Sequence, residues 1–372
     1  MAIFDDIVGQ DLALTVLRRA LSAGAAHAYL FTGPSGVGKG EAAVEFAAAL
    51  TCPDGGCGEC DCCRRVREGI HPDVDVLSPE GTFITVDQIR EINREVALRP
   101  FEARVRVYVI LEAESMNVPA ANAFLRTLEE PPPHAHFVLV SSQPEELLDT
   151  IVSRCQRVPF RRTPAPLLGR HLSERFGLSE IDATAFARVA QGDLAYGRRL
   201  ASDPMAREWR LRLIEWARSI PGASTLDAEN MLDEIFASVE RQADARVEAL
   251  DARKEADLGW AADARTRARV EKLHDQKVKR ERRRAVNDGL EEVMRTLAGW
   301  YRDLAAAAMG ADEAVLNHDY AYELQSEAFP GRVEAYVAAI DCARRATRRF
   351  RYNVDARCAL EDMVLSIKEA LL

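Results

Sequence analysis

The stretch GPSGVGKG, residues 33 to 40, has the residue types and the spacing of a loop that binds the phosphates of a nucleotide. In such loops, backbone N–H groups and a lysine hold the phosphates, and a final Ser or Thr binds Mg²⁺ through its hydroxyl. Here the last position is Gly40, so the phosphate cradle is present and the hydroxyl is missing. We expect a degenerate nucleotide site, with a glycine-rich turn that binds nothing as the alternative. The loop consists of Gly33, Pro34, Ser35, Gly36, Val37, Gly38, Lys39 and Gly40.

The second protein contact to Mg²⁺ in such sites is an Asp at the end of a later strand. The later apolar run VRVYVILEAES has Leu111 followed by Glu112 where an Asp-Glu pair would be expected. With both metal contacts missing, the sequence predicts weak or absent ATP hydrolysis, a lost Mg²⁺ site, and weak or absent binding of ATP or ADP. Glu112 either orients a water molecule or is a polar residue without a role at a strand end.

A second group of residues that could do chemistry is a cluster of cysteines, since five of the eight lie between residues 52 and 63. Four thiolates with short, glycine-containing spacers can close tetrahedrally on a structural Zn²⁺ ion. The adjacent Cys62 could replace the last ligand, and His71 could also be proposed as one. We expect His71 and Asp73 instead to form the turn into the next strand. The four ligands we expect are Cys52, Cys57, Cys60 and Cys63.

Short apolar runs alternate with helical patterns through the first 160 residues, as in a parallel sheet with helices on both faces. The loop at residues 33–40 then follows the first strand and opens a helix, which is the context that a phosphate loop requires. We expect helices over residues 39–50, 85–98 and 119–130. The expected strands are residues 28–33, 74–79, 105–113, 136–142 and 155–160.

The strand signals vanish after residue 162, and the rest of the chain reads as helical. Residues 163–205 form a group of short helical patterns, and residues 206–372 contain long amphipathic ones. Within the latter, residues of about 241–284 are highly charged and poor in large apolar side chains, which predicts a long exposed helix or a partly flexible insert. We expect one α/β domain, residues 1–162, with the cysteine module 52–63 inserted, followed by two all-helical domains.

Composition excludes several classes of protein. The 372 residues are 48% hydrophobic and 29% charged, which is ordinary for a globular protein of two or three domains. A formal net charge of −10 argues against a protein that coats nucleic acid with its whole surface. The apolar runs are too short to span a bilayer, and the start MAIFDDIVGQ has no features of a signal peptide. We expect a cytoplasmic protein without membrane contact.

Several motifs in the first 200 residues resemble the delta-prime family of bacterial DNA polymerase III clamp-loader subunits, which are AAA+ proteins. The resemblance implies an AAA+ domain with a zinc module, a helical lid at residues 163–205 and a collar that mediates oligomerisation at residues 206–372. The motifs, in chain order, are FDDIVGQDLALTVLRRAL, HAYLFTGPSGVGKG, CGECDCCRRVREGIHPDV, ANAFLRTLEEPP and FVLVSSQPEELLDTIVSRCQRVPF.

In this family, the subunit joins motor and delta subunits in a hetero-pentamer that loads the sliding clamp on primer-template DNA during replication. The resemblance implies a stator with little or no ATP hydrolysis, so the chain itself would not be catalytic, although it is part of a DNA-directed DNA polymerase holoenzyme. Ser153-Arg154-Cys155 matches the family's SRC motif, in which Arg154 would act in trans as an arginine finger on ATP bound to a neighbouring motor. Arginine fingers stabilise charge in the transition state of phosphoryl transfer.

Two further positions fit a subunit that is not a motor. Ser141 and Ser142 lie where motors place a polar sensor, and Ala195 lies where they carry a phosphate-sensing arginine, with Arg198 close by. Two other functions remain open: an active clamp-loader motor, and a nucleic-acid-binding regulator on a dead ATPase fold. The basic run KVKRERRR, residues 277–284, either contacts DNA phosphates or is a solvated helix face.

Overall fold

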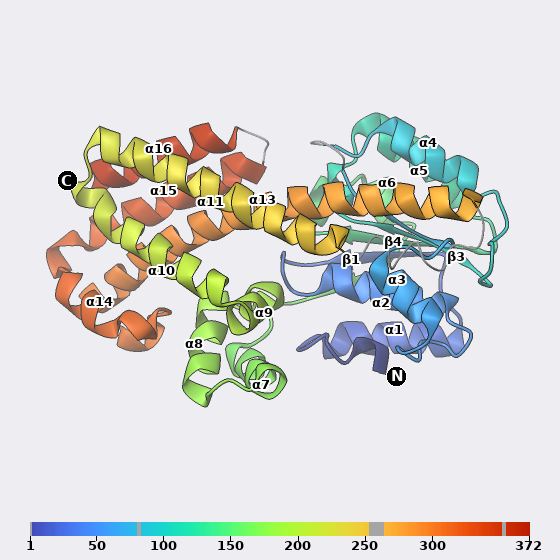
Figure 1. The fold of residues 1–372 in the computed structure, drawn as a ribbon, viewed down its shortest axis with the longest axis horizontal. Coiled ribbons are helices and arrows are strands. Elements are labelled where there is room, and N and C mark those ends of the chain that lie inside the picture. Colours follow the sequence, from blue (N-terminus) through green and yellow to red (C-terminus); the bar gives the residue numbers. More distant parts are fainter. Residues whose placement is uncertain (1, 80–82, 253–263, 352–354) are drawn as a thin grey trace. The chain divides into compact units, whose positions relative to one another are not determined.

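The computed structural model describes residues 2–79, 83–252, 264–351 and 355–372 (Figure 1). By its internal contacts the chain divides into two compact units, which we describe separately. The first unit comprises Met1–His171, Gln191–Tyr196 and Ala252–Arg280. The second unit comprises Leu172–Ala190, Gly197–Asp251 and Glu281–Leu372. The division into AAA+, lid and collar domains stays a prediction.

The first unit is built on a five-stranded parallel sheet in the order β2-β3-β4-β1-β5. All five expected strands are confirmed. Thr32, at the end of β1, lies opposite Ser141, at the end of β4, so the loop after β1 begins beside the residues that follow β4. The strands are β1 (Ala28–Thr32), β2 (Val74–Leu77), β3 (Arg106–Ile110), β4 (Ala135–Ser141) and β5 (Gln156–Pro159).

Both faces of this sheet are covered by helices, because successive side chains of a strand point to opposite faces. Tyr29 and Phe31 enter the core formed with the helices α1, α2 and α3, while Ala28 and Leu30 enter the core formed with α4, α5 and α6. Figure 1 shows α1, α2 and α3 on one side of the sheet and α4 and α5 on the other. The helices are α1 (Asp11–Ala23), α2 (Lys39–Thr51), α3 (Asp61–Glu68), α4 (Val86–Glu95), α5 (Val118–Glu129) and α6 (Asp149–Val152).

Local sequence explains where the two longer helices on the second face begin and end. The side chain of Thr85 caps α4 through the backbone N–H of Gln88, and the side chain of Gln88 returns a bond to the Thr85 backbone. Asn117 caps α5 by accepting from the N–H of Ala120 at 2.9 Å. Because three prolines follow at residues 131–133, α5 cannot continue past its observed end.

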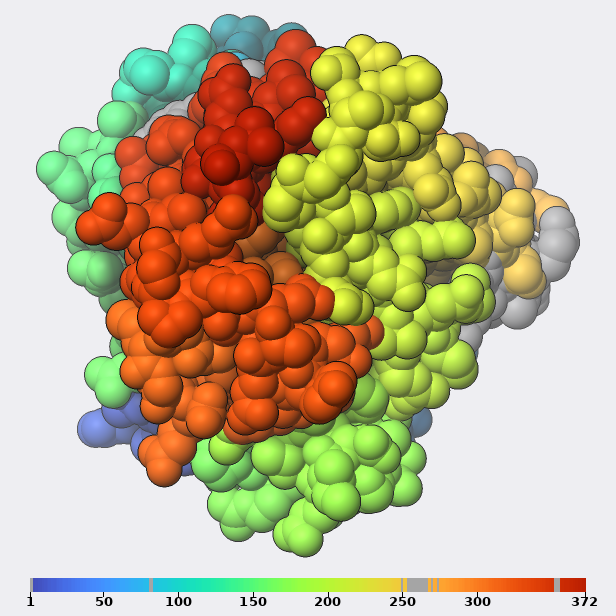
Figure 2. All heavy atoms as spheres, turned by 90° about the vertical axis from the view of Figure 1, so that its left-hand side faces the viewer, coloured from blue at the N-terminus to red at the C-terminus, as the bar shows by residue number. Residues whose placement is uncertain are grey.

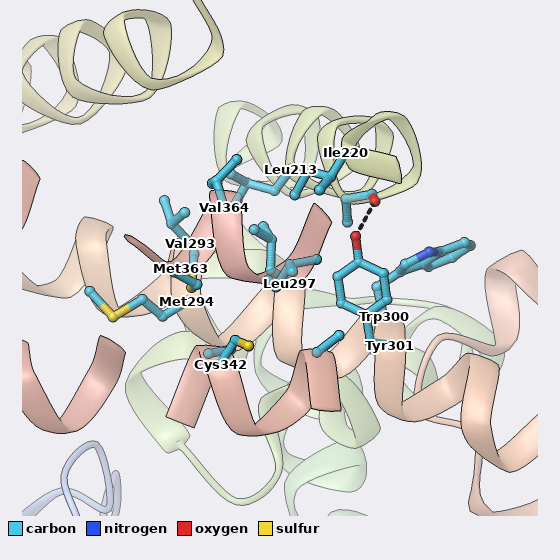
Figure 3. Close-up of a cluster of buried hydrophobic side chains, with 14 of the residues drawn as sticks. Leu213, Ile220, Val293, Met294, Leu297, Trp300, Tyr301, Cys342, Met363 and Val364 are labelled. Atoms are coloured by element: carbon cyan, nitrogen blue, oxygen red, sulfur yellow. Dashed lines mark hydrogen bonds between the residues drawn. The ribbon is translucent and has the colours of Figure 1, made fainter. Parts of the chain in front are cut away.

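The second unit is helical around one hydrophobic core that includes the tryptophans Trp209 and Trp300. In this core, the Tyr301 hydroxyl donates to the carbonyl oxygen of Ala217 at 2.6 Å (Figure 3). The yellow atoms of α11 lie beside the red atoms of α16 on the face in Figure 2. The remaining helices are α7 (Ala165–Phe176), α8 (Glu180–Ala190), α9 (Leu194–Ser202), α10 (Pro204–Ser219), α11 (Thr225–Asp251), α13 (Ala264–Ala308), α14 (Ala321–Glu327), α15 (Val333–Arg351) and α16 (Ala356–Leu371).

The charged segment at residues 241–284 is helical where the structure describes it, in the end of α11 and the start of α13; residues 253–263 lie outside the described residues. The expectation of an exposed helix is wrong at Val270 and His274, which are 1% and 2% exposed. Residues 264–280, which we call the α13 arm, belong to the first unit, and Val270 packs there on Ile70. Hydrophobic periodicity did not predict this apolar contact, because most residues of the arm have long charged side chains.

Among the described helices of the chain, none is long and apolar enough to cross a membrane.

Candidate nucleotide loop, cysteine cluster and arginine

The glycine-rich loop connects β1 to α2, and its backbone geometry requires glycine at two positions. Gly33 has φ of 140°, and a Cβ atom there would lie 2.2 Å from the carbonyl oxygen of Phe160. Gly36 has φ of 77°, and a Cβ atom there would lie 2.3 Å from the carboxylate of Asp193. Since α2 begins at Lys39, the loop lies at the amino end of a 13-residue helix, where backbone N–H groups can hold an anion.

Lys39 is held inside this loop and is only 5% exposed. Its Nζ donates to the carbonyl oxygens of Gly33 at 2.6 Å and Pro34 at 2.5 Å, and to the Ser142 hydroxyl at 3.1 Å. Burial lowers the pKa of Lys39 to about 8, although the carboxylates of Glu114 and Asp193 act in the opposite direction. The ammonium group therefore has acceptors within the chain before any phosphate is present.

Gly40 and Leu111, the two positions where metal contacts are missing, face each other. A Cβ atom built on Gly40 would meet only the Cδ2 atom of Leu111, at 3.7 Å. Neither a hydroxyl nor a carboxylate is available from these two residues. Because 3.7 Å is an ordinary van der Waals contact, the backbone has room for a serine at position 40.

Glu112 is exposed and adopts a left-handed backbone conformation, with φ of 51° and ψ of 47°. The acidic residue of this loop that acts electrostatically on Lys39 is Glu114, which the sequence analysis did not identify. Glu114 accepts from the backbone N–H of Ser142 at 3.0 Å. Its position three residues beyond Leu111, in the same strand-end loop, is the signal that could have found it.

Of the two serines at the end of β4, only Ser142 contacts the loop, through Lys39 and through the Ser35 hydroxyl at 3.2 Å. Ser141 is buried and instead accepts from the N–H of Gln143 at 3.1 Å. The segment Gln191–Tyr196 also lies on the loop, because the N–H of Leu194 donates to the Gly36 carbonyl at 2.9 Å. Ala195, at the expected sensor-arginine position, brings no cation to this place.

The four expected cysteines come together at the end of α2 and the start of α3. Their Sγ atoms all lie within 4.8 Å of one another. The Sγ atom of Cys52 is 3.9 Å from that of Cys57 and 3.7 Å from that of Cys60. Four sulfurs about 2.3 Å from a central Zn²⁺ in a tetrahedron would be about 3.8 Å apart, so the donor set fits this metal. With four thiols, it also leaves no open position for a reacting water.

The ionisation of Cys52 suits a metal ligand, since metals bind the thiolate. Burial acts to raise the pKa of this thiol, but backbone N–H groups, with that of Cys57 the strongest, outweigh burial and lower the pKa to about 6. Cys60 caps α3 by accepting from the N–H of Cys63. The short helix α3 is thereby built directly onto the cluster.

Cys62 and His71 lie outside this cluster and contact each other, with Cys62 Sγ 3.5 Å from His71 Nε2. His71 is 1% exposed, and its Nδ1 accepts from the N–H of Asp73 at 3.1 Å. Burial lowers the pKa of His71, although Glu102 at 3.0 Å opposes this. Asp73 in turn accepts from the three consecutive N–H groups of residues 101–103. Both side chains therefore serve the loops around β2.

Arg154 lies between α6 and β5, and its side chain is 32% exposed. Its Nη1 donates to the carbonyl oxygen of Thr150 at 2.8 Å, and its Nη2 pairs with the carboxylate of Glu129. The guanidinium group therefore has two fixed acceptors and still faces solvent in part.

Comparison with known proteins gives a match over nearly the whole chain. The DNA polymerase III subunit delta' of Bacillus subtilis is 28% identical over 346 residues, which cover 92% of this chain and 91% of that protein. A family model described as DNA polymerase III, delta subunit, matches residues 9–164. The chain is therefore similar to subunits of DNA polymerase III. The loop, the cysteine cluster and Arg154 all lie within the segment that the family model matches.

The other clamp-loader relatives match more locally. The tau subunit of Bacillus subtilis is 36% identical over 233 residues, which cover 59% of this chain and 41% of that protein. The tau subunit of Escherichia coli is 40% identical over 158 residues, 41% of this chain and 24% of that protein. This chain thus spans less than half the length of these tau relatives. A crystal structure of a DNA polymerase III gamma subunit-related protein from Thermotoga maritima aligns with 97% of this chain, at 17% identity and a TM-score of 0.47.

Proposed function

We propose that this chain is a delta-prime-type subunit of a DNA polymerase III clamp loader, a stator that hydrolyses little or no ATP. The match to subunit delta' over nine tenths of both chains supports a role in clamp loading during replication. The observation that carries the stator role is that Gly40 and Leu111 occupy neighbouring positions, where a Cβ atom on residue 40 would lie 3.7 Å from Leu111, and that neither residue offers a ligand for Mg²⁺. Its partners would be the motor and delta subunits and, through the complex, the sliding clamp and primer-template DNA.

The chemistry of phosphoryl transfer explains why these two positions matter. Charge that develops on the transferred phosphoryl group is neutralised by Mg²⁺, held in part by a loop hydroxyl and a strand-end carboxylate. Lys39 and the backbone cradle remain, so ATP or ADP can be held weakly at most, without the ion that promotes hydrolysis. Glu112 has no metal-bound reactant to act on, and we assign it no role in catalysis.

Arg154 would be this subunit's contribution to chemistry in a neighbouring motor. A guanidinium that is one third exposed can reach a phosphate on an adjacent subunit, and such fingers are worth ~10³-fold or more in rate. The four clustered cysteines would hold a structural Zn²⁺ ion. The three-domain organisation that we propose follows the family: an AAA+ domain at residues 1–162, a lid at 163–205 and a collar at 206–372.

A DNA-binding regulator is less well supported, because the basic run at residues 277–284 is largely bonded within the chain. Lys277 donates to the carbonyl oxygen of Glu68, and Arg280 donates to that of Val76 at 3.1 Å. Arg282 pairs with two acidic side chains of α11. These contacts reduce the positive charge that phosphates could meet.

The test combines the isolated chain with a loader reconstituted from the same organism's motor and delta subunits. The isolated chain should hydrolyse ATP no faster than its Lys39→Ala variant. The double variant Gly40→Ser/Leu111→Asp, which restores both metal ligands where there is room for them, should gain Mg²⁺-dependent nucleotide binding. In the DNA-stimulated loader, Arg154→Ala should lower ATP turnover at least tenfold. Turnover by the isolated chain that depends on Lys39 would favour the motor alternative, and an inert Arg154→Ala would remove the finger.

A further inference from the structure

The side chain that holds Arg154 is Glu129, the last residue of α5. We propose that Glu129 is a positioning residue: it holds the guanidinium of Arg154 in the orientation from which it meets a phosphate on the neighbouring subunit. This inference rests on the proposed function of Arg154 as a finger in trans. It adds a residue that acts only through Arg154 and touches no nucleotide itself.

The pair is anchored to the rigid part of the first unit. Helix α5 packs into the sheet core through Phe124 and Leu128, both buried. Its end is fixed by the prolines at residues 131–133, whose backbone has little freedom. A carboxylate at this end of α5 and the Thr150 carbonyl oxygen of α6 together hold the guanidinium at two points. Groups held by packed elements are positioned more accurately than groups on free side chains.

The negative charge of Glu129 is unfavourable for helix α5 itself. The carboxyl end of a helix carries partial negative charge and favours cations, so a carboxylate in the last turn is unfavourable unless a cation compensates it. Arg126 places one cation in the last turn of α5, and the guanidinium of Arg154, which pairs with the carboxylate of Glu129 itself, adds a second. The neighbouring Glu130 is also exposed, and its backbone N–H donates to the carbonyl oxygen of Arg126, but its carboxylate has no hydrogen-bond or ion-pair partner among the described residues. Two adjacent glutamates thus differ in the one contact that the inference needs.

The magnitude follows from the exposure of the pair. The side chains of Arg154 and Glu129 are 32% and 49% exposed, and a pair of this kind shifts an equilibrium by roughly two- to fivefold. Without Glu129 the guanidinium keeps the Thr150 carbonyl oxygen as an acceptor and loses its second point of attachment. We therefore expect a loss of a few fold in turnover, well below the loss caused by removing Arg154.

The first test uses the isolated full-length chain and the ¹⁵N relaxation of the Arg154 Nε–Hε group, assigned with Arg154→Lys. Glu129→Gln keeps a hydrogen-bond acceptor and removes the charge, and Glu130→Gln makes the same change one residue away. The guanidinium should be restrained in the wild type and in Glu130→Gln, and mobile in Glu129→Gln. Equal mobility in all three would overturn the inference, whatever Arg154 does in the loader.

The second test measures DNA-stimulated ATP turnover of the reconstituted loader. Glu129→Gln should lower kcat two- to fivefold with KM for ATP changed less than twofold, and Glu130→Gln should change neither. The double variant Glu129→Gln/Arg154→Ala should be no slower than Arg154→Ala, since Glu129 acts only through Arg154. A further loss in the double variant, or no loss in Glu129→Gln beside an impaired Arg154→Ala, would overturn this inference alone. An unimpaired Arg154→Ala would overturn the finger, and the positioning role with it.

Discussion

Removing the proposed Zn²⁺ ion from the cysteine cluster should release the α13 arm from the rest of the first unit. The arm contacts the segment that follows α3, where Val270 packs on Ile70 and Lys277 donates to the Glu68 carbonyl oxygen. Helix α3 has eight residues and is capped by Cys60, one of the four clustered cysteines. Because an isolated helix of this length is not stable in water, α3 depends on its cap at Cys60 together with the packing of Val66 in the core, and opening the cluster removes the first of these.

The expected loss can be worked out from these contacts. Burial of Val270, which is 1% exposed, contributes about 2 kcal/mol. The hydrogen bond from the charged Lys277 contributes roughly 2 kcal/mol. Their sum, about 4 kcal/mol, corresponds to a ~10³-fold change in the equilibrium for local opening. Two contacts of the arm do not involve α3 and should remain: Arg280 with the Val76 carbonyl oxygen, and Lys272 with Glu91.

Hydrogen–deuterium exchange of the full-length chain can measure this change, with and without a strong zinc chelator. Protection at residues 264–280 should fall by two to three orders of magnitude, because an undocked helix end frays. Residues 333–351 of α15, in the second unit, should not change. Cys63→Ser should reproduce the effect of the chelator, while Cys62→Ser, which lies outside the cluster, should not. If α3 loses protection and the arm keeps it, the arm is held independently and the reasoning is wrong.

Two further predictions concern charged groups that are buried. The pKa of Lys39 is lowered in the folded chain, so between pH about 8 and its ordinary value of 10.5 only the unfolded chain binds this proton, and stability should rise with pH in that window. Relative to Lys39→Met, the gain should approach roughly 3 kcal/mol in urea unfolding at pH 10.5, and parallel curves for the two proteins would contradict the assignment. In the second unit, Arg199→Ala should cost about 3–5 kcal/mol, because it leaves the carboxylate of Glu292, which is 0% exposed, without its ion pair. Thermal unfolding of Arg199→Ala and of Arg199→Ala/Glu292→Leu measures this, and the second variant should recover most of the loss.

The sheet and its helices could be predicted because their signals are local. Strands β1, β3 and β4 are apolar runs buried on both faces, while the outer strands β2 and β5 are partly exposed. Each run ends in residues that favour turns. Helix α5 has a capping residue before it and three prolines after it, so both of its ends can be predicted from the sequence. The order of the strands and the covering of each face follow only once the whole chain is folded.

The cysteine ligands illustrate a choice that spacing alone left open. Cys62 and Cys63 are adjacent, and on a helix adjacent side chains point about 100° apart. The structure turns Cys63 toward the other three thiols and Cys62 toward His71 and Thr51. The orientation of α3 determines which of the two cysteines joins the cluster. This orientation depends on the packing of Val66 in the core, which no sequence motif predicts.

The contacts that sequence analysis missed join polar residues far apart in the chain. Glu114 meets Ser142 28 residues away, and Glu129 meets Arg154 25 residues away. Polar surface residues carry no periodic signal, so neither pair could be found by pattern. Glu114 and Ser142 lie beyond the carboxyl ends of β3 and β4, where a parallel sheet brings functional groups together. Glu129 and Arg154 instead lie before the amino ends of β4 and β5, where α5 and α6 end.

A retained lysine in the loop is weaker evidence for nucleotide binding than it looks in the sequence. Lys39 satisfies the carbonyl oxygens of Gly33 and Pro34 and the Ser142 hydroxyl, so the fold has its own reason to keep it. Replacing it leaves three partly buried acceptors without this donor and disturbs the loop whether or not a nucleotide ever binds. At position 40 the structure has room for an added Cβ atom, so a gain of Mg²⁺-dependent binding in Gly40→Ser/Leu111→Asp would report on the added metal ligands. The added side chains, more than the deleted lysine, separate a degraded motor from a stator.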